Sequence, residues 1–122
     1  MLEIADLHAG YGPTDVVHGV SFTVPDHSVF AVMGHNGAGK TTLLKTVLGL
    51  LPSRRGMITF DGEDITRVKT HQRVARGMAY VPQGQLSFPH LTTAENLQLV
   101  ADGRKNGAEN VEEMFTLSLI HI

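Results

Sequence analysis

The chain has 122 residues, of which 42% are hydrophobic and 18% are charged, a composition typical of one small globular domain. Twelve acidic residues against ten basic ones give a net charge of −2, which argues against nucleic-acid binding through a broad basic surface. Cysteine is absent, which excludes disulfides and thiolate metal sites, and no run of about 20 apolar residues predicts a membrane span.

The N-terminal third of the sequence predicts strands. Residues 2–7 indicate a short extended segment that ends in the glycine-rich turn 10–13. The run 16–24 alternates apolar and polar residues, which is typical of a half-buried strand. The run 29–33 is continuously apolar, so we expect a strand that is buried on both faces, at the centre of a sheet.

A helix is predicted from about residue 39 to residue 50, with Pro52 after its end. One face of this helix is apolar, and its members are Leu43, Leu44, Val47, Leu48 and Leu51. A further strand is expected at 57–60, closed by the hairpin signal Asp61-Gly62.

The remaining elements follow at short intervals. A short helix is expected at 70–76 and a strand at 78–81. A second helix is expected at 92–101, because Thr92 and Glu95 have the spacing of a capping box. The polar, glycine-containing stretch 102–110 predicts a loop.

The most specific pattern lies between the apolar run 29–33 and the first helix, and it is Gly34-His35-Asn36-Gly37-Ala38-Gly39-Lys40-Thr41. It matches G-x-x-x-x-G-K-[ST] at every defined position. Glycines let successive backbone amides converge on phosphate oxygens, and the helix N-terminus adds partial positive charge. We expect Lys40 to reach the β- and γ-phosphates and the Thr41 hydroxyl to bind Mg²⁺.

An accidental glycine-rich turn is the alternative to this phosphate cradle. The position between a buried strand and a helix disfavours that alternative, because phosphate binding requires such a junction. The glycine spacing also excludes the dinucleotide-binding fingerprint, which needs a third glycine at another place. The pattern therefore predicts a nucleoside triphosphate site.

The stretch from Asn36 to Leu44 resembles the ATP-binding cassette (ABC) transporter family. In that family an aromatic residue at the position of Tyr11 stacks on adenine, and a glutamine at the position of Gln83 contacts Mg²⁺ and the attacking water. An ordinary turn tyrosine and a strand-end glutamine are the alternatives. The resemblance implies an α/β fold, with a P-loop NTPase (RecA-like) core and an antiparallel β-subdomain.

The resemblance and the cradle together define the expected site for ATP and Mg²⁺. The expected nucleotide-binding residues are Tyr11, Gly34, His35, Asn36, Gly37, Ala38, Gly39, Lys40, Thr41 and Thr42. Lys40 and Gln83 are the expected catalytic residues, and Thr41 and Gln83 the expected metal ligands.

Two later stretches, 80–84 and 88–97, look like the ATPase subunits of branched-chain (hydrophobic) amino-acid importers. That resemblance implies ATP hydrolysis that drives uptake, by a dimer of ATPase subunits under membrane permease subunits, on the cytoplasmic face of the membrane. The side chains expected to contact the permease are Leu86, Phe88 and Pro89, because such residues are unusual in a loop that faces only water. Alternatively, Phe88 packs into the core. No nucleic-acid partner is expected.

Some positions depart from the family pattern. Asp26-His27 occupies a turn where the family usually has glycine, and Gln85 and Ser87 replace a commoner arginine and isoleucine. These differences affect the expected hairpin and permease contact but not the cradle. The seven histidines show no metal-ligand spacing.

Two family sequences do not occur in the chain: the Leu-Ser-Gly-Gly-Gln signature and an apolar strand that ends in Asp-Glu. The run Leu99 to Asp102 is no substitute, because Gly103 follows it and its apolar residues have helical spacing. We therefore expect residues 1–116 to be the N-terminal part of an ABC nucleotide-binding domain, truncated before the helical-subdomain signature and the catalytic-base strand. Such a chain is expected to bind ATP weakly and not to hydrolyse it.

The last six residues, 117–122, differ from the family and spell Leu-Ser-Leu-Ile-His-Ile. The codons CTG TCT CTT ATA CAC ATC encode this hexapeptide and match a transposon-derived sequencing adapter. We expect a non-native tail, which the coding sequence would test. A genuine apolar C-terminal turn is the alternative.

Four functions remain open at this point. The preferred one is a branched-chain amino-acid importer ATPase, and the nearest alternative is the ATPase of a urea-type importer. A third is a cytosolic ABC ATPase without transport, but such relatives usually carry large insertions, and only residues 41–82 separate Lys40 from Gln83. The fourth is a non-functional truncated product.

Overall fold

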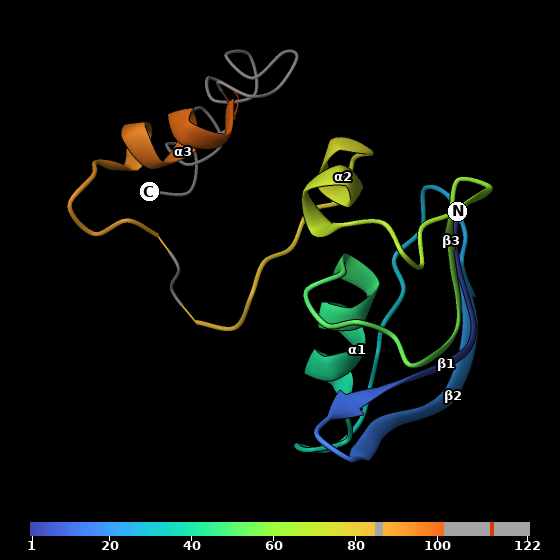
Figure 1. The fold of residues 1–122 in the computed structure, drawn as a ribbon. Helices are drawn as coiled ribbons and strands as arrows, with labels where there is room; N and C mark the ends of the chain where they lie inside the picture. Colours follow the sequence, from blue (N-terminus) through green and yellow to red (C-terminus); the bar gives the residue numbers. More distant parts are fainter. Residues whose placement is uncertain (85–86, 102–112, 114–122) are drawn as a thin grey trace. The chain divides into compact units, whose positions relative to one another are not determined.

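The computed structural model describes residues 1–84, 87–101 and 113. The chain divides into two compact units, Met1–Tyr80 and Val81–Ile122 (Figure 1).

The first unit contains an antiparallel sheet of four strands in the order β2-β1-β3-β4. The strands are β1 (Leu2–Tyr11), β2 (Thr14–Val24), β3 (Arg55–Phe60) and β4 (Glu63–Asp64). A tight turn joins β1 to β2, and β1 pairs with both β2 and β3. The antiparallel β-subdomain and the hairpin at Asp61-Gly62 are thereby confirmed.

A β-bulge in β1 decides which side chains face the core. Strict alternation from Ile4 would turn Asp6 and His8 inward. Instead, Asp6 has φ 47° and the pairing register shifts there, so Leu7 and Ala9 are fully buried. The bulge thus keeps the apolar residues of β1 on one face. Gly56 of β3 permits it, because a Cβ at this position would lie 2.3 Å from the Asp6 carbonyl oxygen.

Two helices of the first unit, α1 (Lys40–Leu48) and α2 (Thr70–Ala75), lie on one side of the sheet (Figure 1). Both were expected within about two residues. Helix α1 ends at Gly49, whose φ of 84° is left-handed and whose amide donates to the Thr46 carbonyl at 3.1 Å.

The core of the first unit lies between the sheet and α1. Its buried members are Ile4, Leu7, Ala9, Val17, Leu43, Val47, Ile58 and Ile65. Leu44 of α1 is 44% exposed, so the apolar face of the helix is only partly covered.

Arg73 of α2 fixes the C-terminal end of α1. Its guanidinium is 2% exposed and donates to the carbonyls of Thr46 and Val47, at 3.1 and 2.6 Å. It also donates to Val68 and Thr66, at 2.8 and 3.0 Å. Carbonyls at a helix C-terminus carry partial negative charge, which suits a buried cation. The burial lowers the pKa of Arg73.

Two expected strands are absent from the structure, and here the prediction is wrong. Residues 29–33 form no strand, and Val29 and Met33 are 102% and 89% exposed. Residues 78–81 form no strand either. A central strand is stabilised by hydrogen bonds to neighbours on both edges, and none of the described residues pairs with 29–33. The segment is anchored only in part, by Phe30, whose ring stacks on Phe22 with centroids 5.0 Å apart.

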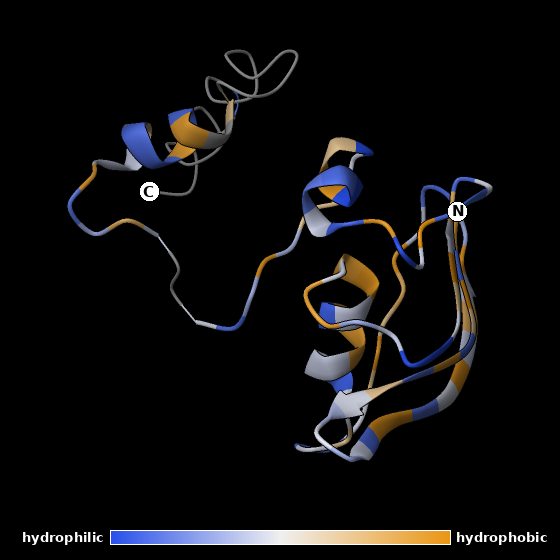
Figure 2. Cartoon of the chain, in the orientation of Figure 1, coloured by the Kyte–Doolittle hydropathy of each residue, from blue (hydrophilic) through white to orange (hydrophobic). Residues whose placement is uncertain are grey.

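In Figure 2 the connection from β2 to α1 is coloured mostly as hydrophobic. In the part of the chain that the structure describes, no helix has the length and apolarity needed to cross a bilayer.

The second unit contains α3 (Thr93–Ala101), and its expected capping box is confirmed. The Glu95 amide donates to Thr92 Oγ1 at 3.1 Å, and the Thr92 amide donates to Glu95 Oε2 at 2.8 Å. Asn96 organises the preceding loop by exchanging hydrogen bonds with the Phe88 backbone at 2.8 and 3.1 Å. The expected loop 102–110 and the tail 117–122 lie outside the described residues.

Candidate functional site

The cradle Gly34–Thr41 forms a tight loop that leads directly into α1. Gly37 and Gly39 have φ of 86° and 94°, which other residues rarely adopt. Gly39 also lies against β2, since a Cβ there would be 3.1 Å from Val16 Cγ1 and 3.2 Å from the Val16 carbonyl oxygen. Its backbone therefore requires glycine on two grounds. The cradle follows an extended segment rather than the expected strand.

The loop is closed by its own backbone. The Ala38 amide donates to the His35 carbonyl at 3.1 Å, which makes a turn at the middle of the cradle. At Gly34 a Cβ would lie 3.1 Å from the Ala38 Cβ, so the two arms of the loop approach closely. The exposed His35 has its Nδ1 atom 2.9 Å from the Asn36 carbonyl oxygen.

Lys40 folds back over the cradle. Its ammonium group donates to the Gly34 carbonyl, and it lies 3.4 Å from the His35 carbonyl oxygen. These neutral acceptors leave the positive charge without a carboxylate partner among the residues that the structure describes. A phosphate oxygen would be a stronger acceptor for the same group.

The N-terminus of α1 is open to an anion. Gly39 provides no side-chain cap, and the first turn contains no acidic residue. The first amides of a helix have no partner within it, so those of Lys40, Thr41 and Thr42 are available as donors. Thr41 is exposed, whereas Thr42 is 6% exposed. Thr42 is therefore suited to contribute its backbone amide, and Thr41 its hydroxyl.

The same residues fit Mg²⁺ bound together with phosphate. Mg²⁺ prefers oxygen ligands and usually keeps phosphate oxygens and water among them. The exposed Thr41 hydroxyl is a ligand of this kind, beside the expected phosphate position. Within residues 1–84, 87–101 and 113, no three His, Asp or Glu side chains gather as a metal site. The donor set therefore suits a metal that arrives with the triphosphate.

A hollow of about 370 Å³ opens beside the cradle. Its wall comes from β2, from the segment before the cradle and from α1, and its lining includes Val16, His18, Met33, Gly39 and Lys40.

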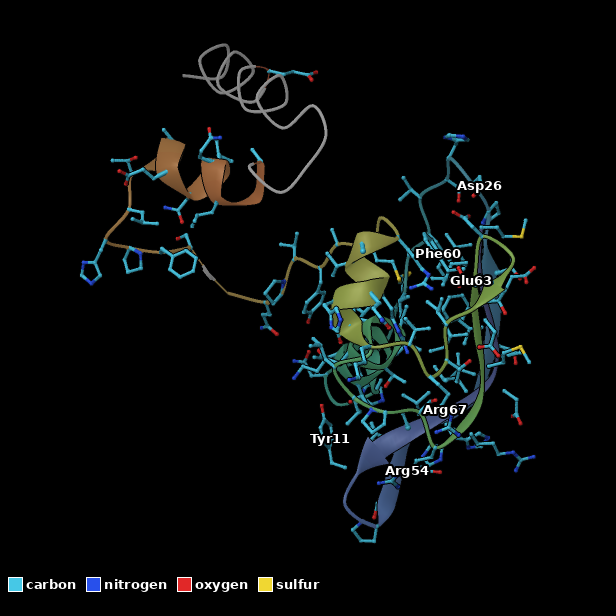
Figure 3. The ribbon with its side chains drawn as sticks, turned by 45° about the horizontal axis from the view of Figure 1, so that its top comes forward. Tyr11, Asp26, Arg54, Phe60, Glu63 and Arg67 are labelled. Carbon is cyan, nitrogen blue, oxygen red and sulfur yellow. The ribbon has the colours of Figure 1, made fainter. Side chains whose placement is uncertain are left out.

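Tyr11 lies at the end of β1, in the hairpin that contacts the cradle through Val16 and Gly39. Its side chain is 54% exposed and extends from the tip of the β1 arrow (Figure 3). Gly10 must be glycine here, because a Cβ would lie 2.3 Å from the Thr14 carbonyl oxygen. The end of β1 and the N-terminal end of α1 lie at the same end of the first unit (Figure 1), and the role of Tyr11 at the base stays a prediction.

Two polar residues at this turn were not predicted from the sequence. Arg54 donates to the Gly12 carbonyl and to Asp15 Oδ1, the latter at 2.8 Å. No local pattern indicates this contact, because Arg54 and Asp15 lie 39 positions apart in the chain.

Gln83 lies in the second unit, where it is exposed. In the same unit Phe88 is 60% exposed and Pro89 is exposed, so Phe88 is not packed into a core there. Leu86 lies outside the described residues. The role of Gln83 at the nucleotide stays a prediction.

Comparison with known proteins gives consistent matches. The family model described as "ABC transporter" matches residues 17–121. The lipopolysaccharide export system ATP-binding protein LptB of Haemophilus influenzae is 41% identical over 106 residues, which cover 87% of this chain and 44% of that protein. The probable branched-chain amino acid transport ATP-binding protein LivF of Archaeoglobus fulgidus is 39% identical over 101 residues, covering 83% and 43%.

Solved structures agree with these sequence matches. An ATP-binding subunit of an ABC transporter has a TM-score of 0.72 and 36% identity, over 83% of this chain and 41% of that one. An ABC transporter protein from Pyrococcus furiosus, with 33% identity, has a TM-score of 0.70 over 83% and 47%. The chain spans less than half the length of each of these four proteins.

Proposed function

The chain belongs to the ABC transporter family and has the P-loop NTPase fold of its ATP-binding subunits, and from that premise we propose that it binds ATP with Mg²⁺ at the cradle Gly34–Thr41. The observation that carries the proposal is the junction at Gly39. An uncapped helix N-terminus, left-handed glycines and a lysine with no carboxylate partner in the described part of the chain meet there. Each of these features favours a polyanion.

We propose a different contact with the nucleotide for each group of cradle residues. The amides of Gly37, Gly39, Lys40, Thr41 and Thr42 donate to phosphate oxygens, and the backbone of His35, Asn36 and Ala38 shapes the loop. Lys40 exchanges its carbonyl contacts for β- and γ-phosphate oxygens, where it offsets negative charge that grows during phosphoryl transfer. Thr41 offers its hydroxyl to Mg²⁺, which neutralises phosphate charge when bound.

Two further residues complete the proposed site. We propose that Tyr11 stacks on the adenine ring, for which its exposed side chain is accessible. Gln83 contacts the metal and the attacking water in the full-length protein, as the family resemblance implies.

We propose that the full-length protein is the ATPase of a transporter for branched-chain or hydrophobic amino acids, acting as a dimer with permease subunits at the cytoplasmic face of the membrane. The stretches 80–84 and 88–97 and the 39% identity to the transport protein LivF support this substrate class. The exposed Phe88 and Pro89 supply an apolar surface for a permease. Lipopolysaccharide export is the second candidate, because an export protein matches at 41% identity.

The cradle is tested by the variant Lys40→Ala, with Lys45→Ala as its matched control on the last turn of the same helix. Titration of the purified chain with a fluorescent ATP analogue and Mg²⁺ is expected to show at least about a tenfold loss of affinity for Lys40→Ala, since a charged hydrogen-bond donor contributes about 1.5–3 kcal/mol. Lys45→Ala should bind like the unchanged chain. Equal affinities in the two variants would contradict the proposed site.

Turnover distinguishes the chain from its full-length parent. In the parent, Lys40→Ala or Thr41→Ala is expected to remove nearly all ATPase activity, because both groups act on the reacting phosphate. The 122-residue chain itself should release no phosphate above the Lys40→Ala background. Activity of either parent variant within a few-fold of the unchanged protein would refute the assigned roles.

The transported substrate is tested in the source organism. Permease and amino-acid-binding protein genes beside the coding sequence, with loss of leucine uptake on deletion, would support import. Intact uptake together with retained lipopolysaccharide inside the cell would favour export instead.

A further inference from the structure

We propose that Arg54 is a positioning residue for nucleotide binding: it holds the turn of Tyr11 in the place where the tyrosine ring meets the base. This inference rests on the proposed ATP site and extends it to Arg54, the residue directly before β3, whose side chain bonds the Gly12 carbonyl and the Asp15 carboxylate rather than the cradle.

The turn needs an external support because its own sequence is permissive. Tyr11 stands between Gly10 and Gly12, and glycine restricts the backbone less than any other residue. Gly12 has φ 61°, in the left-handed region, and a Cβ there would have no neighbour within 4 Å. Close packing at Gly10 and the pairing of Tyr11 with Thr14 hold the last residues of β1, but packing does not fix the backbone at Gly12. An aromatic platform that is free to move would lose part of its stacking energy to ordering.

Arg54 contacts the turn on both sides of its tip. One Nη donates to the Gly12 carbonyl, and the other donates to Asp15 Oδ1 at 2.8 Å. The planar guanidinium spans the two acceptors with fixed geometry, which the single ammonium of a lysine does not reproduce. The clamp consists of Arg54, the Gly12 carbonyl and the Asp15 carboxylate.

The clamp is itself anchored in the sheet. The Arg54 amide donates to the His8 carbonyl of β1 at 2.8 Å, so the residue is held where β3 begins. The side chains of Arg54 and Asp15 are 34% and 32% exposed, which shields the ion pair partly from water. His8 Nδ1 approaches the other Asp15 oxygen at 3.7 Å. Figure 3 shows Arg54 and Tyr11 at the same end of the sheet.

The clamp is also connected to the cradle. Asp15 directly precedes Val16, and Val16 contacts Gly39 at the start of α1. A turn fixed by Arg54 therefore keeps a set position beside the phosphate loop. Loss of Arg54 should therefore weaken the contribution of the base to the binding affinity and leave the contribution of the phosphates unchanged.

The test compares two ligands on the purified chain, MgATP and inorganic tripolyphosphate with Mg²⁺, by titration calorimetry. Arg54→Ala is expected to weaken MgATP binding about fivefold, roughly half of a base-stacking contribution of about 1–3 kcal/mol, and to leave tripolyphosphate binding unchanged. Arg54→Lys should lie between, because it keeps the charge and loses the two-sided contact. Arg55→Ala is the matched control, since Arg55 is 74% exposed and pairs with Asp6 at 3.3 Å. It should behave like the unchanged chain.

The double variant Tyr11→Ala/Arg54→Ala decides whether Arg54 acts through the tyrosine. The effect of Arg54→Ala should largely disappear in the Tyr11→Ala background. An effect that persists there, or an equal loss of tripolyphosphate binding, would overturn the inference. If Arg54→Ala does not fold, as judged by circular dichroism, Arg54→Lys carries the same comparison.

Failure of the inference is distinguishable from failure of the proposed site. If Tyr11→Ala leaves MgATP affinity unchanged, base stacking is absent and the inference fails, while the Lys40→Ala result still stands for the cradle. If Lys40→Ala binds tripolyphosphate normally, the cradle assignment fails first.

Discussion

The antiparallel sheet and the apolar segment 29–33 differ in burial and in backbone pairing. In the sheet, Leu7, Ala9 and Ile58 are fully buried and every strand has a neighbour. The segment 29–33 is more continuously apolar than any of these strands, yet it forms no strand, pairs with none of the described residues and is largely exposed. Hydrophobicity alone therefore does not make a strand. A partner for its backbone is also needed.

The difference follows from sequence distance. The hairpins β1–β2 and β3–β4 close over a few residues, so their hydrogen bonds form locally. A central parallel strand depends on neighbours far along the chain. Three measurements would sharpen this contrast between the paired and the unpaired region.

The largest effect is expected from Arg73→Met, which tests the polar anchor of the folded region. The substitution removes hydrogen bonds to four carbonyls, two of them at the end of α1, and should lower the free energy of unfolding by about 3 kcal/mol. Urea unfolding followed by circular dichroism measures it. Arg67→Met is the control, because Arg67 is exposed and should change stability little. Equal unfolding midpoints for the two variants would show that Arg73 anchors nothing.

An intermediate effect is expected from one substitution made in both regions. Val17→Ala removes buried methyl groups from a residue that is 4% exposed and should cost about 2 kcal/mol. Val29→Ala, at 102% exposure, should stay within about 0.5 kcal/mol. Comparable losses at the two positions, in the same urea experiment, would mean that 29–33 is packed in solution and the contrast is wrong.

The smallest effect is expected from pH at the exposed end of the sheet. Hydrogen bonds and charge from Arg76, at 2.7 and 3.0 Å, lower the pKa of Glu63 below its ordinary 4.5. Because the folded pKa is depressed, the stabilisation is present above about pH 4.5 and is lost as the pH falls through the folded pKa. Glu63→Gln should flatten this acid limb slightly, in thermal melts between pH 6 and 3 (roughly the window where carboxylates titrate). An unchanged acid limb would show that the pair is screened.

Local sequence patterns predicted the elements that depend on neighbouring residues. The capping box of α3, the end of α1 near Gly49 and the hairpin at Asp61-Gly62 were confirmed within about two residues. The cradle could be placed for the same reason, since its glycines and Lys40 are contiguous. The roles of Tyr11 and Gln83 came from family resemblance and stay predictions.

The sequence by itself determined that a glycine-rich loop with the phosphate-binding pattern precedes a helix, because the pattern consists of eight consecutive residues. Only the tertiary structure decided that Asp6 forms a bulge, that Arg73 closes the end of α1 and that Arg54 supports the turn of Tyr11. These contacts join residues far apart in the chain, and no periodicity or local pattern encodes them. The same physical reason explains why the strand predicted at 29–33 is wrong. A strand forms only with a hydrogen-bonded partner strand, and a segment's own residues do not identify that partner.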